Sequence, residues 1–204
     1  MANDASHANV DTAWLRSRFA GRVANSMMKE IPAEIKTLRA ASVLIPIIER
    51  DAGLTVLFTR RTEHLQAHAG QISFPGGGAE ESDESPIATA LRETEEEIGL
   101  HRRHVEVLGS LDLHPTVTGY RVTPVVGLVR PPFDLRLDAF EVAEIFEVPL
   151  TFLLDPANRR RDSMVREGRV REFDAVPYGP HYIWGATAAM LVQFHRFLLG
   201  EAQS

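Results

Sequence analysis

Apolar residues recur along the chain at the two periods that distinguish helices from strands. Four-residue steps between Leu15, Phe19, Val23 and Met27 predict a helix over residues 11–28. Runs rich in β-branched and aromatic residues instead predict strands, at residues 40–49, 54–61, 71–74, 105–113, 121–129, 144–148, 161–167 and 169–176. Turns at Asp51-Ala52-Gly53 and at Glu167-Gly168 would join neighbouring members of this set.

Helical spacing returns at the end of the chain. Met190, Phe194, Phe197 and Leu198 would form the inner face of a helix over residues 187–199 that stops at Gly200. Strands mixed with a few helices predict an α/β (α+β) fold, an α/β/α sandwich around a mixed sheet. We expect a helical extension over residues 1–36 and one domain over residues 37–200.

The amino-acid composition restricts the classes of function that are compatible with the chain. The chain has 204 residues, of which 44% are hydrophobic, so it can bury a sizeable core. Its net charge of −6 argues against binding nucleic acid through the phosphate backbone. The absence of cysteine excludes disulfides and thiolate metal sites. No apolar run reaches membrane-spanning length and no signal-peptide core is evident, so we expect a cytoplasmic protein without a membrane partner.

The segment from residue 76 to residue 100 carries the clearest chemistry. Ser85 is a suitable N-cap, Pro86 suits the first helical position, and Gly99 suits the end of a helix. At about 100° per residue, the apolar side of this helix is a narrow stripe. The stripe consists of Ile87, Leu91, Thr94 and Ile98.

Three glutamates, Glu93, Glu96 and Glu97, share the other side of this helix at spacings of three and four residues. Like charges at these spacings repel, each pair costing about 0.2–0.5 kcal/mol in an isolated helix. A hard divalent cation would reverse that repulsion, because it takes oxygen ligands of this kind. Most such glutamate runs are simply solvated helix faces, so the surrounding residues must decide between the two interpretations.

Those residues follow the order and spacing of a known motif. The sequence GGGAEESDESPIATALRETEEEIGL resembles the Nudix box, with Thr94 at a position that the general pattern reserves for an aliphatic residue. The matching positions are Gly78, Glu84, Arg92-Glu93, Glu96-Glu97, Gly99 and Leu100. The resemblance implies Mg²⁺, with Mn²⁺ as a substitute, bound by Glu93, Glu96, Glu97 and the Gly78 carbonyl. It also implies that Arg92 orients the carboxylates, with Glu84 as a supporting residue.

The residues before the box narrow the resemblance further. The segment LFTRRTEHLQAHAGQISFPGG resembles the coenzyme A pyrophosphatase branch of the Nudix superfamily through Thr59, Arg61, Gly70 and Phe74-Pro75-Gly76-Gly77. Gln66 stands where that branch has an arginine, which removes a permanent cation. The branch implies cleavage of coenzyme A or an acyl derivative into 3′,5′-ADP and a 4′-phosphopantetheine fragment. The general base stays open among Glu93, Glu141 and Glu144.

Five residues are candidates for substrate contact. Arg60 and Arg61 could bind phosphate, although strand alternation would turn one of them to the other face of the sheet. His68 and Gln71 flank a glycine turn and could shape the pocket, and Tyr120 follows Gly119 in an expected loop. The partner is thus a small nucleotide-type molecule, and the resemblance also implies a homodimer.

Two other functions are compatible with the sequence. One is a Nudix hydrolase of ADP-ribose or another nucleoside diphosphate derivative, because Pro115 lies at the distance past the box associated with ADP-ribose hydrolases. The other is a non-catalytic nucleotide sensor on the same fold. Sensors often lose box carboxylates, whereas this chain keeps every one.

Overall fold

The computed structural model describes residues 10–20, 35, 37–64, 69–166 and 168–200. Its central layer is an eight-stranded mixed sheet. The central strand β1 (Arg39–Arg50) runs parallel to β7 (Tyr120–Val129) and antiparallel to β2 (Gly53–Arg61) and β4 (Gly76–Gly78). Strand β2 also pairs with β3 (Ile72–Ser73) and β8 (Val142–Pro149). Strand β7 also pairs with β5 (Val105–Ser110) and β6 (His114–Pro115).

One edge of β1 is shared between two partners. Residues 41–43 pair with β4, whereas residues 47–50 pair with β2. At the change of partner, the Leu44 amide donates a hydrogen bond to the Pro75 carbonyl, 2.9 Å away. The glycine strand that precedes the predicted box is therefore fixed against the central strand.

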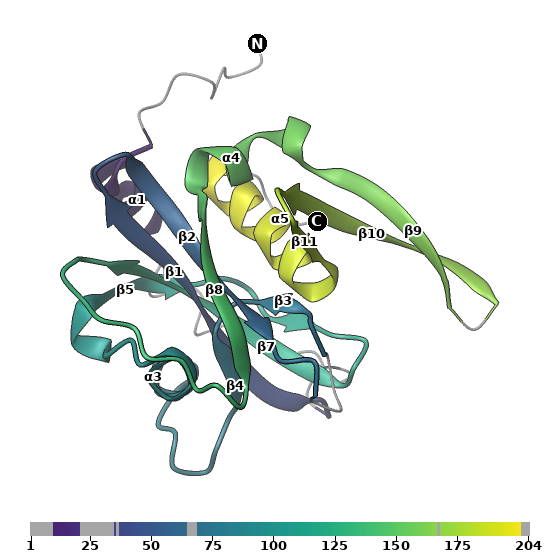
Figure 1. Ribbon diagram of the computed structural model, residues 1–204, viewed down its shortest axis with the longest axis horizontal. Helices are drawn as coiled ribbons and strands as arrows, with labels where there is room; N and C mark the ends of the chain where they lie inside the picture. Colours follow the sequence, from purple (N-terminus) through teal and green to yellow (C-terminus); the bar gives the residue numbers. More distant parts are fainter. Residues whose placement is uncertain (1–9, 21–34, 36, 65–68, 167, 201–204) are drawn as a thin grey trace.

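Helices cover both faces of the sheet, as Figure 1 shows. One face packs against α3 (Pro86–Ile98) through a cluster that includes Leu44, Leu57 and Ile98. The other face packs against α5 (Gly185–Leu199) through a larger cluster. Into that second cluster α1 (Thr12–Phe19) inserts Leu15 and Phe19.

A second sheet, of three strands, follows the first in sequence. The short helix α4 (Leu150–Leu154) and a 3-10 turn (Pro156–Asn158) lead into β9 (Arg160–Arg166), β10 (Arg169–Tyr178) and β11 (His181–Trp184). Strand β10 is the central strand, and the β9–β10 hairpin extends away from the main sheet (Figure 1). A further 3-10 turn (Arg102–His104) precedes β5.

The predicted α/β/α sandwich is confirmed, and the strand pairs around Gly53 and Gly168 lie where the pattern placed them. Strands β4, β6 and β11 and helix α4 were not predicted. The N-terminal helix, predicted from residue 11, begins at Thr12 after the cap Asp11, and α1 ends at Phe19. Its predicted continuation over residues 21–28 lies outside the described residues, as does Glu167. In the described part of the chain, no helix has the length and apolarity needed to cross a membrane.

Candidate active site

The helix α3 forms as its sequence signals predict. Ser85 accepts a hydrogen bond at Oγ from the Ala88 amide (3.1 Å), and Pro86 occupies the first turn. Gly99 ends the helix in the left-handed conformation, with φ of 69°. Thr94 is fully buried within the apolar stripe and donates its hydroxyl to the Ala90 carbonyl (2.6 Å), so its polar group is satisfied.

Glu97 is buried, with 6% of its surface exposed. Glu97 lies on the side of α3 that carries the box glutamates, as expected, but this side is not exposed to solvent at Glu97, because β4 covers it. One carboxylate oxygen accepts a hydrogen bond from the Gly76 amide (3.1 Å), and the other lies 3.7 Å from the Arg61 guanidinium. Burial raises the pKa of Glu97 to about 7, and this amide and guanidinium only partly oppose the shift.

Glu93 lies one turn earlier, against the glycine strand. A Cβ at Gly77 would overlap its carboxylate, so the absence of a side chain at Gly77 creates the space that Glu93 occupies. Burial is the largest cause that raises the pKa of Glu93, and contact with Arg92 opposes it. Repulsion from Glu96 and Glu141 acts in the same direction as burial.

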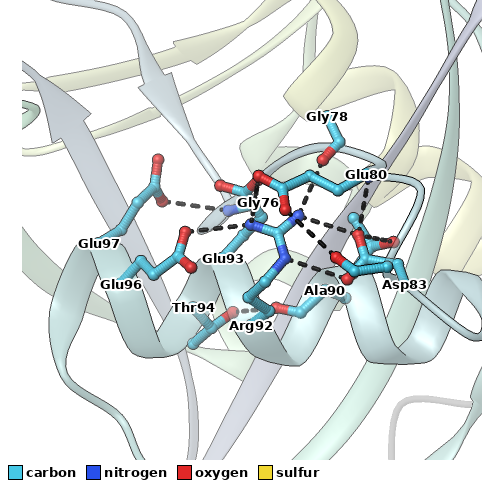
Figure 2. A network of polar contacts seen from close by, with 12 residues as sticks. Gly76, Gly78, Glu80, Asp83, Ala90, Arg92, Glu93, Thr94, Glu96 and Glu97 are labelled. Atoms are coloured by element: carbon cyan, nitrogen blue, oxygen red, sulfur yellow. Dashed lines mark hydrogen bonds and ion pairs between the residues drawn. The ribbon is translucent and has the colours of Figure 1, made fainter.

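Arg92 lies at the centre of the box, as Figure 2 shows. Its Nη1 donates to Glu93 (2.9 Å) and to Glu96 (3.0 Å), and its Nη2 donates to the Gly78 carbonyl (3.0 Å). Arg92 thus contacts two of the box glutamates and the glycine strand, and the orienting role expected for it stays a prediction. Glu84, the loop residue expected to support the box, does not contact Arg92 in the described part of the chain; the neighbouring Asp83 does.

The three candidate bases lie in different surroundings. Glu141 precedes β8 on the same side as Glu97, 3.8 Å from Arg61, and its charge helps raise the pKa of both Glu93 and Glu97. Glu144 lies on the opposite face of the sheet, where it pairs with Arg60 (2.8 Å) and His181 (3.0 Å). Strand alternation explains the separation, because Glu144 and Phe146 face the α5 side of β8.

The oxygen atoms of the box fit a divalent cation by their chemistry. In their present arrangement, no three carboxylate or imidazole side chains of the described residues converge around one point, because Arg92 lies between Glu93 and Glu96. Yet Glu97 is a buried carboxylate, and the nearest cationic side chain among the described residues, Arg61, lies 3.7 Å away. Like charge also raises the pKa of Glu97 and of Glu93. A bound cation would offset both the burial of the Glu97 charge and the repulsion between the carboxylates. The donor atoms are all oxygen, which Mg²⁺ and Mn²⁺ prefer.

The predicted substrate residues are distributed over two faces. Arg61 meets Glu97 on the α3 side, whereas Arg60 is paired with Glu144 on the α5 side. The Gln71 carbonyl accepts a hydrogen bond from the Arg61 amide (3.0 Å). Tyr120 begins β7 beside Arg39, whose guanidinium lies 5.1 Å from the ring centre. The prediction for His68 falls outside the described residues.

A cleft of about 310 Å³ lies beside the amino end of α3. Its walls come from β1, β7, the box loop, the first turn of α3 and Leu113. They include Ser42, Ala79, Asp83, Thr89, Arg121 and Thr123. This volume is in the range of small-molecule sites. The sequence pattern did not predict the cleft, because residues from four separate segments of the chain form it.

Two curated Nudix hydrolases match this chain in sequence over most of its length. The Nudix hydrolase NudL of Photorhabdus laumondii is 42% identical over 173 residues, which cover 83% of this chain and 92% of NudL. NudL of Escherichia coli is 41% identical over 163 residues, covering 79% and 84% of the two chains.

Solved structures share the fold. An Ap4A hydrolase of C. elegans in a binary complex is 16% identical with a TM-score of 0.53, covering 78% of this chain and 98% of the other. RenU, a Nudix hydrolase of M. smegmatis, is 19% identical with a TM-score of 0.54, covering 81% and 89%. The NUDIX domain model matches residues 38–167. The chain therefore belongs to the Nudix hydrolase family, enzymes that act on the diphosphate bonds of nucleoside diphosphate derivatives and generally use divalent metal ions.

Proposed function

We propose that this Nudix hydrolase cleaves the diphosphate of coenzyme A or an acyl-coenzyme A, releasing 3′,5′-ADP and 4′-phosphopantetheine or its acyl form. The cofactor is Mg²⁺, for which Mn²⁺ substitutes. The observation that carries the reaction type is the buried Glu97 carboxylate grouped with Glu93 and Glu141. The choice of coenzyme A depends on the resemblance of the segment from Leu57 to Gly77 to the coenzyme A pyrophosphatase branch.

Glu93, Glu96, Glu97 and the Gly78 carbonyl would hold the cation. When bound, it would neutralise the diphosphate and lower the pKa of a water molecule. For these oxygen atoms to reach a cation, Arg92 must give up part of its contact with Glu93 and Glu96. Arg92 would then keep the two carboxylates oriented from one side.

The hydrolytic step needs a nucleophilic water and a proton acceptor. The water oxygen bonds to one phosphorus, the anhydride P–O bond breaks, and the leaving phosphate keeps the bridging oxygen. The proton of the water goes to a carboxylate, for which we propose Glu141. Glu141 lies on the Glu97 side and is 43% exposed at its side chain, whereas Arg92 holds Glu93, and Glu144 lies on the other face.

Arg61 is suited to contact a phosphate. Its guanidinium lies 3.7 Å from Glu97 and 3.8 Å from Glu141, beyond hydrogen-bond distance, and its Nε is buried without a hydrogen-bond partner among the described residues. An anionic substrate group would satisfy these donors. Arg60 is less suited to this role, because its Nε already donates to Glu144 (2.8 Å).

A turnover panel tests the proposal. The purified protein is assayed with Mg²⁺ and coenzyme A, ADP-ribose, NADH or diadenosine polyphosphates, with Glu97→Gln protein as the control for contaminating activity. We expect the highest kcat/KM for coenzyme A or an acyl derivative, with 3′,5′-ADP as a product. Equal or better turnover of ADP-ribose, the alternative that Pro115 favours, would reject coenzyme A as the preferred substrate.

A further inference from the structure

Asp83 is the most enclosed acidic side chain of the loop before α3. Its side chain is 6% exposed. Besides Arg92, its carboxylate accepts hydrogen bonds from the Glu80 amide and from the Thr89 hydroxyl, both at 2.9 Å. An enclosed carboxylate with this many donors is fixed in position and stays ionised, and its hydrogen bonds with Arg92 lower its pKa.

The guanidinium of Arg92 has an acceptor for each of its five N–H groups. Asp83 takes two of them as a fork, from Nε at 3.0 Å and from Nη2 at 2.9 Å. The other three point to Glu93, Glu96 and the Gly78 carbonyl (Figure 2). A two-point contact to a fixed carboxylate sets the plane of the guanidinium, and that plane sets the direction of the three remaining N–H groups.

We infer that Asp83 is a positioning residue of the box, which acts through Arg92 on Glu93, Glu96 and the Gly78 carbonyl. This inference rests on the proposed role of those three groups in holding the cation. Without the two hydrogen bonds to Asp83, the guanidinium is free to rotate relative to Glu93, Glu96 and the Gly78 carbonyl. It would then compete with the cation for Glu93 and Glu96 instead of holding them from one side.

The box motif would give this role to the neighbouring Glu84, and the structure argues against that assignment. Glu84 is exposed, and within the described residues its carboxylate has no hydrogen bond or ion pair. Asp83 occupies a position that the motif leaves free. The pair of adjacent acids therefore offers a matched comparison, in which each variant removes one negative charge from the same loop.

The experiment compares Asp83→Asn with Glu84→Gln in the full-length protein. In the metal-free proteins, the Nε–H signal of Arg92 in a ¹H–¹⁵N spectrum reports the fork directly. We expect Asp83→Asn to lose or shift this signal and Glu84→Gln to keep it. Electron paramagnetic resonance then gives the Mn²⁺ dissociation constant, which we expect to rise about 10–100-fold for Asp83→Asn and to change little for Glu84→Gln.

A double variant separates positioning from a general structural effect. If Asp83 acts through Arg92, Asp83→Asn adds little further loss of Mn²⁺ affinity in an Arg92→Ala background. If Asp83→Asn does not fold, Thr89→Val, which removes one of the donors that hold Asp83, should weaken Mn²⁺ binding in the same direction. An unchanged Arg92 signal in Asp83→Asn, or equal effects of the two single variants, would overturn the inference. Failure of the wild-type protein to bind Mn²⁺ would instead overturn the proposed metal site, while the metal-free spectrum would still decide the role of Asp83.

Discussion

Replacing Glu97 by glutamine should stabilise the metal-free protein at pH 8 while removing its activity. The ordinary pKa of a glutamate is 4.5, and burial raises that of Glu97 to about 7. A raised carboxylate pKa means that the fold disfavours the charged form. The cost to folding is therefore absent below pH 4.5, grows as the pH rises, and is complete above pH 7.

The size of the effect follows from the same two pKa values. Since each pH unit between them is worth about 1.4 kcal/mol, ionised Glu97 lowers the free energy of unfolding by ~3 kcal/mol. Glutamine carries no charge, and its amide oxygen can still accept the Gly76 N–H. We expect Glu97→Gln to raise the metal-free unfolding free energy by ~1–3 kcal/mol at pH 8 and by little at pH 4.5.

Urea unfolding of wild-type, Glu97→Gln and Glu49→Gln proteins at both pH values measures this difference. Glu49 is an exposed glutamate, so its variant controls for the loss of one negative charge. A saturating divalent cation should stabilise the wild-type protein and not Glu97→Gln, and turnover by Glu97→Gln should fall by orders of magnitude. A metal-free Glu97→Gln protein that is less stable than wild type at pH 8 would refute this reasoning.

Four further substitutions, compared in two pairs, test the geometry of the site. The atoms nearest to a Cβ at Gly77 all belong to the movable carboxylate of Glu93, so Gly77→Ala should reduce turnover strongly with little loss of melting temperature. A Cβ at Gly76 overlaps the backbone of β1, so Gly76→Ala should lower the melting temperature as well, and a thermal melt beside a turnover assay distinguishes the two. Glu141→Gln should lower kcat about 10²–10⁴-fold as the loss of a general base, and Glu144→Gln should lower it less; similar losses in kcat would reject the assignment of Glu141.

The local signals in the sequence were sufficient for the elements that depend on neighbouring residues. The cap at Ser85, the stop at Gly99 and the hairpin through Gly53 all form where the pattern predicts them. Each of these features depends on interactions between residues that are close together in the sequence, so the local sequence is enough to predict it. The glycine strand β4 was missed, because three glycines have no strand propensity and the strand forms only by pairing with β1.

The site was predicted less completely than the fold, for a physical reason. The burial of Glu97 depends on β4 and Arg61, which lie 21 and 36 positions away from it in the sequence. Helical periodicity places Glu97 on the polar side of α3 but does not show that another element covers that side. The choice of Asp83 over Glu84 likewise depends on which of two adjacent carboxylates the loop turns toward Arg92.

The most direct test is the anomalous scattering of Mn²⁺ in crystals of the protein with a bound nucleotide. We predict an anomalous peak within coordination distance of the carboxylate oxygens of Glu93 and Glu97, beside the Gly78 carbonyl. Absence of a peak at these oxygen atoms, in crystals where the nucleotide diphosphate is bound next to α3, would contradict the assignment of the box as the metal site.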